Sequence, residues 1–274
     1  MTKSETAGAL PRGGGEMGDR IRAFDWTQHP FGPPETWPPA LLTTLGICLT
    51  SSFPTAIYWG RELRLLYNDA WSVIPAERHP WALGRTAREV WHDIWDVVGE
   101  QFEAVLEQGV GFSTYDQMLP IERGGAVQET YWNYSITPIL DANGKVAGIF
   151  NQGNETTANI FTARAIAAEA DRLRETFAQA PGAIAILRGP EHRFESANAA
   201  YIELVGGRAE IVGKPAAEAL PEVVAQGFIG LLDQVRESGE PYAGSGVPVG
   251  LNRDGVAEER VIDFNYQQIG RAHV

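Results

Sequence analysis

The sequence predicts an α+β protein of two similar domains, each a five-stranded antiparallel sheet with helices on one face, the second domain lacking its last strand. Matching features recur 129 or 130 residues apart: Asn68 with Asn198, Gly84 with Gly213, Gly109 with Gly239, and Tyr134 with Phe264. Strand-like and helix-like segments also follow the same order in each copy. A repeat this long indicates duplicated domains, because solenoid repeats span about 20–50 residues.

The first copy covers residues 20–157 and follows a flexible tail over residues 1–19, which is rich in glycine and poor in large apolar residues. Its long helix is expected at Ile94–Gln108, where apolar residues recur with a 3.6-residue period and Gly109 supplies the C-terminal cap. Short helices are expected between Asn68 and Val90, and a turn at Asp141–Gly144. The five expected strands are Pro54–Trp59, Leu63–Tyr67, Phe112–Ile121, Val127–Ile139 and Lys145–Gln152.

The second copy covers residues 179–267 in the same order, with a helix expected at Val223–Ser238. Its expected strands are Ala183–Leu187, His192–Ser196, Pro241–Leu251 and Glu258–Gln267. Alternate residues of the fourth strand are apolar in both copies, which predicts an inward face; they are Trp132, Tyr134 and Ile136, matched by Ile262, Phe264 and Tyr266.

Residues 158–178 are expected to form a helix that connects the two domains, because Glu155–Phe177 contains neither Gly nor Pro. Apolar residues in it are spaced four, three and four apart, as in a short heptad seam: Ile166, Ala170, Leu173 and Phe177. Two interpretations remain open. The helix packs its apolar side on one of the domains, or it is a signalling helix through which Glu155–Phe177 forms a homodimer.

The composition narrows the class of protein. Of 274 residues, 44% are hydrophobic and 21% charged, as in ordinary globular domains. A net charge of −13 repels phosphate groups and anionic lipid, so neither nucleic acid nor a membrane is expected as a partner. Polar residues interrupt the most apolar run, Pro39–Trp59, so it predicts no membrane span. The single cysteine, Cys48, forms no internal disulfide, which fits the cytoplasmic location that we expect.

Two pairs of segments carry a resemblance to a known family: LYNDAW (Leu66–Trp71) with SANAAY (Ser196–Tyr201), and LGRTAREVW (Leu83–Trp91) with VGKPAAEAL (Val212–Leu220). They resemble the PAS fold in two copies. The opening FDWTQHPFGPPETWP (Phe24–Pro38) is similar to the entry to the N-terminal PAS regions of bacterial sensor histidine kinases. The resemblance covers about residues 20–267. It implies a tandem PAS sensor region in a two-component phosphorelay, followed by a kinase domain in the parent protein.

The end of the chain departs from this pattern. Thr137 corresponds to Gln267, but only the first copy continues into a last strand. The final residues, QIGRAHV (Gln268–Val274), resemble an in-frame translation of a common sequencing adaptor. We therefore expect residues 268–274 to be non-native and the chain to be a fragment cut inside its second domain.

No catalytic residue or metal site is predicted in this chain, which lacks the Asn- and Gly-rich ATP-binding motifs of a histidine kinase. His92 lies near the place where some haem-binding PAS domains hold their axial ligand. A lone His beside Asp93 is nevertheless typical of a helix start, so haem is not expected. A LOV-type flavin site needs a Cys within Asn-Cys-Arg-Phe, whereas Cys48 precedes the first strand, so this flavin is not expected either. No cofactor is identified.

All eight tryptophans fall within residues 26–132, and those of the first domain suggest a candidate ligand site. The candidate pocket residues are Trp59, Trp71, Trp91, Trp95, Trp132, Tyr134 and Asn68. Such a cluster either lines a pocket for a planar or cationic ligand or fills an aromatic core. Asn68, likewise, is either a helix N-cap or a ligand contact. Any small ligand is expected in the first domain, because the second has no Trp.

Three functions are consistent with these observations. The first is the sensory input of a histidine kinase, which senses a small ligand or a partner and relays the signal through helical linkers. The others are a ligand-free PAS dimerisation or interaction module, and the input region of a diguanylate cyclase. The space between the sheet and the long helix of the first domain separates ligand sensing from pure interaction.

Overall fold

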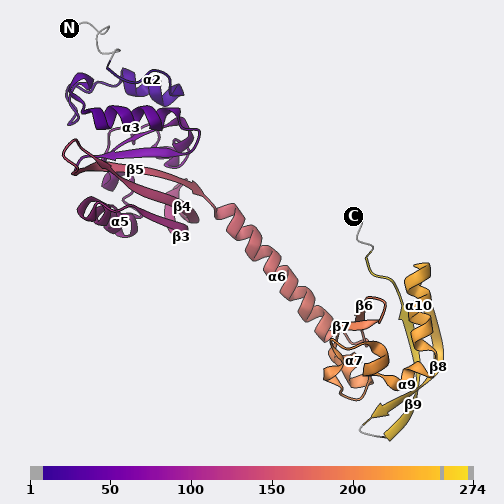
Figure 1. The fold of residues 1–274 in the computed structure, drawn as a ribbon. Helices are drawn as coiled ribbons and strands as arrows, with labels where there is room; N and C mark the ends of the chain where they lie inside the picture. The colour runs from indigo at the N-terminus through magenta and orange to yellow at the C-terminus, as the bar shows by residue number, and fades with distance from the viewer. Residues whose placement is uncertain (1–8, 254–255, 271–274) are drawn as a thin grey trace. The chain divides into compact units, whose positions relative to one another are not determined.

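The computed structural model describes residues 9–253 and 256–270, and divides the chain into two compact units, residues 1–164 and 165–274 (Figure 1). The helix α6 (Thr157–Gln179) belongs to both. The expectations for residues 1–8 and 271–274 lie outside the described residues. In the described part of the chain, no helix is both long and apolar enough to cross a membrane.

Unit 1 (residues 1–164) contains a five-stranded antiparallel sheet, which confirms the predicted α+β class. Its strands lie in the order β2-β1-β5-β4-β3. Their bounds are β1 Thr55–Trp59, β2 Arg64–Tyr67, β3 Phe112–Arg123, β4 Ala126–Leu140 and β5 Val146–Glu155. The last strand in sequence, β5, is central and pairs antiparallel with both β1 and β4. The turn at Asp141–Gly144 forms as expected, with the Gly144 N–H donating to the carbonyl of Asp141.

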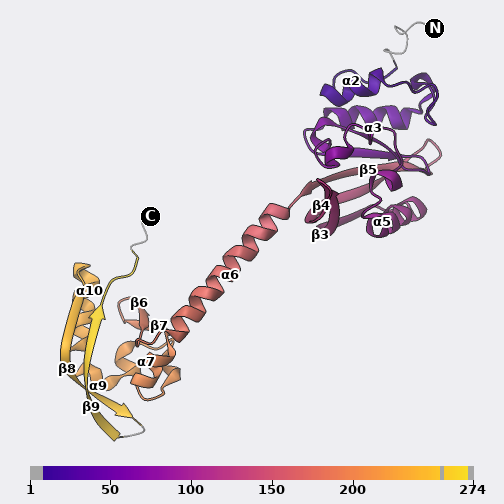
Figure 2. The ribbon, with the colours of Figure 1, turned by 180° about the vertical axis from the view of Figure 1, so that it is seen from behind.

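Helices cover both faces of this sheet, so the prediction of helices on one face is wrong for unit 1. In Figures 1 and 2, α5 (Trp95–Gln108) lies on one side, and α2 (Gly15–Ala23) and α3 (Pro39–Thr50) on the other. The sequence carries the reason, because Ala56, Ile57 and Tyr58 are apolar in succession and all buried. A strand with consecutive buried residues needs cover on both faces. The short helices are η1 Pro34–Thr36, η2 Asp69–Trp71, η3 Ala76–Arg78 and α4 Ala87–Val90.

The prediction of a flexible tail is also wrong for the described part of residues 1–19. Helix α2 begins at Gly15 and buries Met17 and Ile21. Its first N–H groups need acceptors, and the Asp69 carboxylate supplies them: it accepts from the N–H of Glu16 at 3.0 Å and of Met17 at 2.7 Å. The capping side chain lies more than fifty residues away in sequence, so no local pattern could reveal it.

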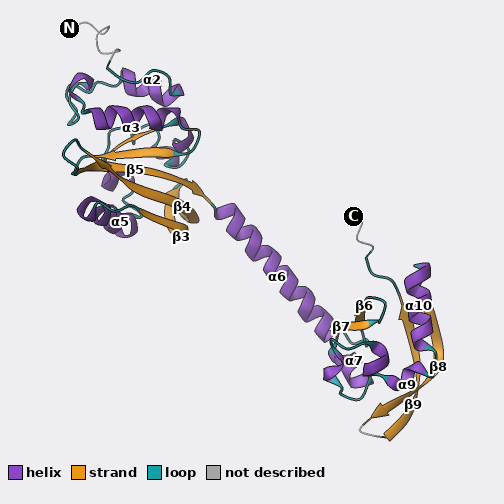
Figure 3. Cartoon of the chain, viewed as in Figure 1, coloured by secondary structure: helices purple, strands orange, loops and turns teal. Residues whose placement is uncertain are grey.

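Unit 2 (residues 165–274) has two separate antiparallel pairs of strands, which Figure 3 shows in orange. They are β6 (Ala185–Arg188) with β7 (Arg193–Ala197), and β8 (Tyr242–Arg253) with β9 (Val256–Tyr266). The expected helix at Val223–Ser238 divides into α9 (Pro221–Val224) and α10 (Phe228–Ser238). Gly227 separates them with φ of 83°, which a glycine adopts at little cost. The other helices are α7 Ala199–Leu204, η4 Ala209–Ile211 and α8 Ala216–Ala219.

Irregularities of the strands correspond between the units. The β3–β4 register shifts between Thr114 and Gln117, and the β8–β9 register shifts 130 residues later, between Gly244 and Val247. At each bulge a side-chain oxygen on the partner strand accepts a backbone N–H: Asn133 from Asp116 and Asp263 from Gly246, both at 2.7 Å. In β7, Glu195 is the residue left out of the ladder with β6. This extra residue changes the spacing between the copies from 129 residues at Leu65 and Phe194 to 130 at Leu66 and Ser196.

Candidate functional site

The predicted aromatic cluster of unit 1 surrounds a cavity between the sheet and α5. Trp71, Trp91 and Trp132 are buried, Tyr134 is half-buried, and all four line this cavity. Its volume is about 60 Å³. One water molecule occupies about 30 Å³ in the liquid, so there is room for water but not for an aromatic ligand. The geometry therefore favours the filled aromatic core over the ligand pocket.

Polar atoms of this cluster form hydrogen bonds with neighbouring side chains of unit 1. The indole N–H of Trp91 donates to the Tyr58 hydroxyl at 2.9 Å, and that of Trp132 donates to Thr130 Oγ1 at 2.7 Å. The Tyr134 hydroxyl donates to Gln101 Oε1. Burial raises the pKa of both Tyr58 and Tyr134. Because these donors already have partners, few groups remain to orient a polar ligand.

Three other predicted pocket residues lie away from the cavity. Trp59, at the end of β1, packs over Gly148, and Trp95 packs over Gly99 within α5. Asn68 is buried, and its Oδ1 accepts from the Trp71 N–H at 2.9 Å, so it is the N-cap of η2. The structure brings together only part of the predicted site.

Unit 2 has a much larger cavity in the corresponding place. Its volume is about 620 Å³, and apolar side chains of α7, α10, β6 and β9 line it. The residues that correspond to Trp71, Trp91, Trp132 and Tyr134 are Tyr201, Leu220, Ile262 and Phe264. All four side chains are smaller than their counterparts in unit 1, which leaves space. This weighs against placing any ligand in the first domain. Comparing side-chain sizes across the repeat shows which copy has the smaller residues, but not the volume that they leave open.

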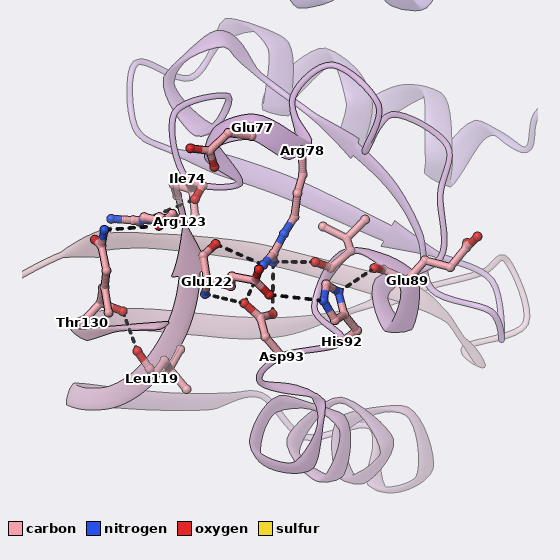
Figure 4. A network of polar contacts seen from close by, with 12 residues as sticks. Ile74, Glu77, Arg78, Glu89, His92, Asp93, Leu119, Glu122, Arg123 and Thr130 are labelled. Carbon is pink, nitrogen blue, oxygen red and sulfur yellow. Dashed lines mark hydrogen bonds and ion pairs between the residues drawn. The ribbon is translucent and has the colours of Figure 1, made fainter. Parts of the chain in front are cut away.

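A polar network holds the tip of the β3–β4 hairpin against the helices of unit 1 (Figure 4). At its centre, Arg78 forms an ion pair with Asp93, and these side chains are only 13% and 7% exposed. Arg78 also donates to the carbonyl of Val90 at 2.7 Å, and Asp93 Oδ2 accepts from the Glu122 N–H at 2.7 Å. Burial alone would raise the pKa of Asp93, but its hydrogen bonds and the charge of Arg78 lower it.

The histidine considered for haem lies at the edge of this network. The His92 side chain is 60% exposed, and its Nε2 is 3.9 Å from a carboxylate oxygen of Glu122. It does not line the cavity of unit 1. Cys48 is buried in α3, and burial raises the pKa of its thiol to about 12. The described residues include no cluster of His, Cys, Asp and Glu suited to a metal ion.

Arg123 links the aromatic core to the start of α6, a connection that the sequence did not reveal. Its guanidinium lies over the Trp132 ring, 5.6 Å from the centroid, and its Nη1 donates to Glu155 Oε2 at 3.0 Å. Glu155 Oε1 in turn accepts from the Thr157 hydroxyl at 2.7 Å, and Thr157 is the first residue of α6. The Nε of Arg123 is buried and has no hydrogen-bond partner among the described residues. A change in the core at Trp132 therefore has a short path to the helix.

Beyond this start, α6 has few contacts with unit 1. Arg164 donates to Glu129 at 2.8 Å and to the Tyr131 hydroxyl at 2.6 Å. Later ion pairs, such as Arg172 with Glu169, lie within the helix itself. No residue of α6 is buried, and on the predicted seam Ile166 is 66% and Leu173 60% exposed. The apolar seam is thus open to a partner.

Comparisons with known proteins identify the fold of unit 2. A family model described as the PAS fold matches residues 177–269, so the chain contains a PAS-fold domain there. Among solved structures, an RNA-binding light-oxygen-voltage receptor is 14% identical with a TM-score of 0.35, over 50% of this chain and 38% of the receptor. A sensory box sensor histidine kinase from Vibrio cholerae is 16% identical with a TM-score of 0.28, over 42% of this chain and 86% of that one. This chain thus spans less than half of the receptor.

Proposed function

We propose that this chain is the sensory input region of a two-component histidine kinase, with a PAS domain in each unit and α6 as the signalling helix between them. The observation that carries the proposal is the connection from Trp132 through Arg123 and Glu155 to Thr157 at the start of α6. It joins the core of a domain to the helix that leaves it. A sensor needs such a connection, because a signal in the core has to shift the conformation of an element that leads to the output domain.

The tandem arrangement is supported by bonds that recur in both units. The bulge contacts of Asn133 and Asp263 correspond, and so do the hydrogen bonds of Asn68 and Asn198. They support a PAS domain in unit 1 as well as in unit 2.

The charge at the link explains how it could transmit a change. Arg123 is largely buried and its Nε has no partner among the described residues, so its position depends on Glu155, on the Trp132 ring and on a long hydrogen bond to the Ile74 carbonyl. A shift of Trp132 would move the guanidinium and loosen its hold on Glu155. The first turn of α6 would then lose an acceptor that Thr157 uses.

A ligand-free interaction module is the second candidate, and one observation favours it. The cavity of unit 1 has only about 60 Å³. In that case unit 1 responds to a partner protein rather than to a small molecule. An input to a diguanylate cyclase uses the same relay, and the output domain is what separates it from a kinase.

The relay can be tested by fusing the chain to the catalytic region of a dimeric histidine kinase and measuring autophosphorylation. Arg123→Gln, which removes the charge facing Glu155, should change kinase activity severalfold and speed hydrogen exchange in the first turn of α6. Arg172→Gln removes an exposed charge of α6 whose ion pair, among the residues that the structure describes, is with Glu169, and it should change neither. Equal kinase activity in the parent fusion and the Arg123→Gln fusion would rule out this relay.

A further inference from the structure

Unit 1 has a second cavity, separate from its aromatic core. Three segments line it: the end of α2 with the loop that follows, strand β2, and the loop that precedes α4. All of its lining residues fall within 20–85, in the unit with the five-stranded sheet. Its volume is about 620 Å³, which is the usual size of a small-molecule site. Unlike the core cavity, it can hold an organic ligand.

The lining of this cavity is basic. It includes Arg20, Arg64 and Arg85, and no Asp or Glu is among the described residues that line it. The chain as a whole has a net charge of −13, so this group of arginines is contrary to its overall composition. A cavity lined by charges of one sign concentrates small ions of the other sign. The lining therefore favours an anion.

Exposed carboxylates pair with two of these arginines without closing the cavity. Arg20 lies 2.7 Å from Glu16 and Arg64 lies 2.8 Å from Glu62, and the two carboxylate side chains are 63% and 64% exposed. Ion pairs of this kind contribute little, because water competes for both partners. An anion inside the cavity can share the guanidinium groups with them or replace them.

Arg85 is the arginine with the fewest bonds of its own. Its guanidinium lies over the Trp81 ring, 5.0 Å from the centroid. Its ion pair among the described residues is with Glu89 at 3.7 Å, which is too long for a hydrogen bond. A guanidinium stacked on a ring keeps its N–H groups in its own plane, where a carboxylate can accept two of them.

Aromatic surface lies beside these charges. Trp81 and Phe24 both line the cavity, and they are 47% and 36% exposed. Exposed rings of this size provide apolar contact for the flat face of another ring. The cavity thus combines cationic groups with aromatic surface.

His29 reports the electrostatic field in the cavity. Its Nδ1 accepts a backbone N–H at 3.2 Å, so Nε2 carries the proton and donates to the Gly84 carbonyl at 3.0 Å. Burial lowers the pKa of His29, and the hydrogen bond to Gly84 opposes this effect. The charges of Arg64 and Arg85 lower the pKa further, and Glu62 raises it by less. The field at the imidazole is therefore positive.

We propose that this cavity binds a small aromatic carboxylate, with the carboxylate at Arg64 and Arg85 and the ring beside Trp81. The two guanidinium groups lie close together along the chain path, since Arg64 Nη1 donates to the carbonyl of Gly84, the residue before Arg85. Binding at this site does not depend on the relay through Arg123. It is measured on the chain alone, so its failure and a failure of the relay are distinguishable.

The test uses the full chain and phenylacetate as the probe. Calorimetric titration should show saturable one-to-one binding, and hydrogen exchange should slow at the amides of 81–85. Phenylacetamide has the ring without the charge, and acetate has the charge without the ring, so each should bind at least tenfold more weakly. In an NMR titration, bound phenylacetate should raise the pKa of His29, because a nearby anion favours the imidazolium.

Variants of the chain locate the site. Arg85→Gln should weaken phenylacetate binding at least tenfold, because a charge-assisted hydrogen bond is lost. Arg88→Gln is the matched control, since it removes an exposed charge three residues away that does not line the cavity. Trp81→Ile should weaken the binding of phenylacetate but not that of acetate.

Four results would overturn the proposal. They are the absence of saturable phenylacetate binding at millimolar concentration, equal affinity for phenylacetate and phenylacetamide, equal affinity of the Arg85→Gln and Arg88→Gln variants, and protection confined to unit 2. Acetate that binds as tightly as phenylacetate would show an anion site without recognition of a ring, which also contradicts the proposed ligand class.

Discussion

Asn68 and Asn198 make the same four hydrogen bonds, one in each unit. Each Oδ1 accepts the N–H of the residue three positions later, at 2.9 Å in both units. Each also accepts a second N–H, from Thr55 at the start of β1 in unit 1 and from Ile184, just before β6, in unit 2. Each Nδ2 donates to two carbonyls of the loop before that strand: Ser51 and Phe53, or Ala180 and Gly182. One buried amide thus joins a helix start, a strand and a loop.

Replacing either asparagine should destabilise its own unit. Asn68→Ala leaves two buried N–H groups and two carbonyls without this partner, so we expect a loss of about 2–3 kcal/mol in the free energy of unfolding. All Trp residues lie within 26–132, so Trp fluorescence in urea reports on unit 1 alone. Asn198→Ala should leave that transition unchanged and weaken unit 2, as followed by circular dichroism. Asn143→Ala, in an exposed turn, is the matched control.

Trp132→Ile places in unit 1 the residue that unit 2 has at the corresponding position. The Trp132 side chain is buried and donates to Thr130, so the change should enlarge the cavity and cost about 2–4 kcal/mol. The variant should also gain binding of small apolar probes such as benzene, detected as a rise in melting temperature. Trp81→Ile, at a side chain that is 47% exposed, should have little effect on either measurement.

Acid should weaken unit 1 through Asp93. The native pKa of this carboxyl lies below its unfolded value of about 3.9, because Arg78 and the Glu122 N–H outweigh the opposing effect of burial. Its stabilisation is therefore complete above the unfolded pKa and is lost as pH falls through the native pKa. Urea unfolding from pH 7 to pH 3 should show this fall, and Asp93→Asn should reduce its slope. Asp96→Asn, at an exposed position of α5, is the matched control for the change in net charge.

The seam on α6 should form a homodimer. Leu173→Glu puts a charge at an exposed seam position and should shift the dimer dissociation constant at least tenfold in sedimentation velocity at micromolar concentration. Ala168→Glu adds the same charge on the opposite side of the helix, 200° from Ile166 at about 100° per residue, and should leave association unchanged. A chain that stays monomeric at every concentration would exclude the seam as a contact between copies.

Local patterns in the sequence predicted much of the fold. Strand positions, the helix at Ile94–Gln108 and its Gly109 cap follow from short-range periodicity and from a backbone conformation that glycine adopts readily. The alternation on β4 gave the correct inward face, since Trp132 and Ile136 are buried. The helix predicted at 223–238 is too long, because Gly227 does not interrupt the apolar periodicity although it is the N-cap at which α10 begins.

The sequence by itself therefore determined the α+β class and the order of the strands and the long helix, because each depends on residues close together in the chain or on a repeated pattern. Only the tertiary structure decided which cavity is open, where α2 and α3 lie, and that Arg123 joins Trp132 to Glu155. These features depend on contacts between residues far apart in sequence. The volume left in a core is a small difference between the space that the backbone encloses and the side chains that fill it, and no local pattern records that difference.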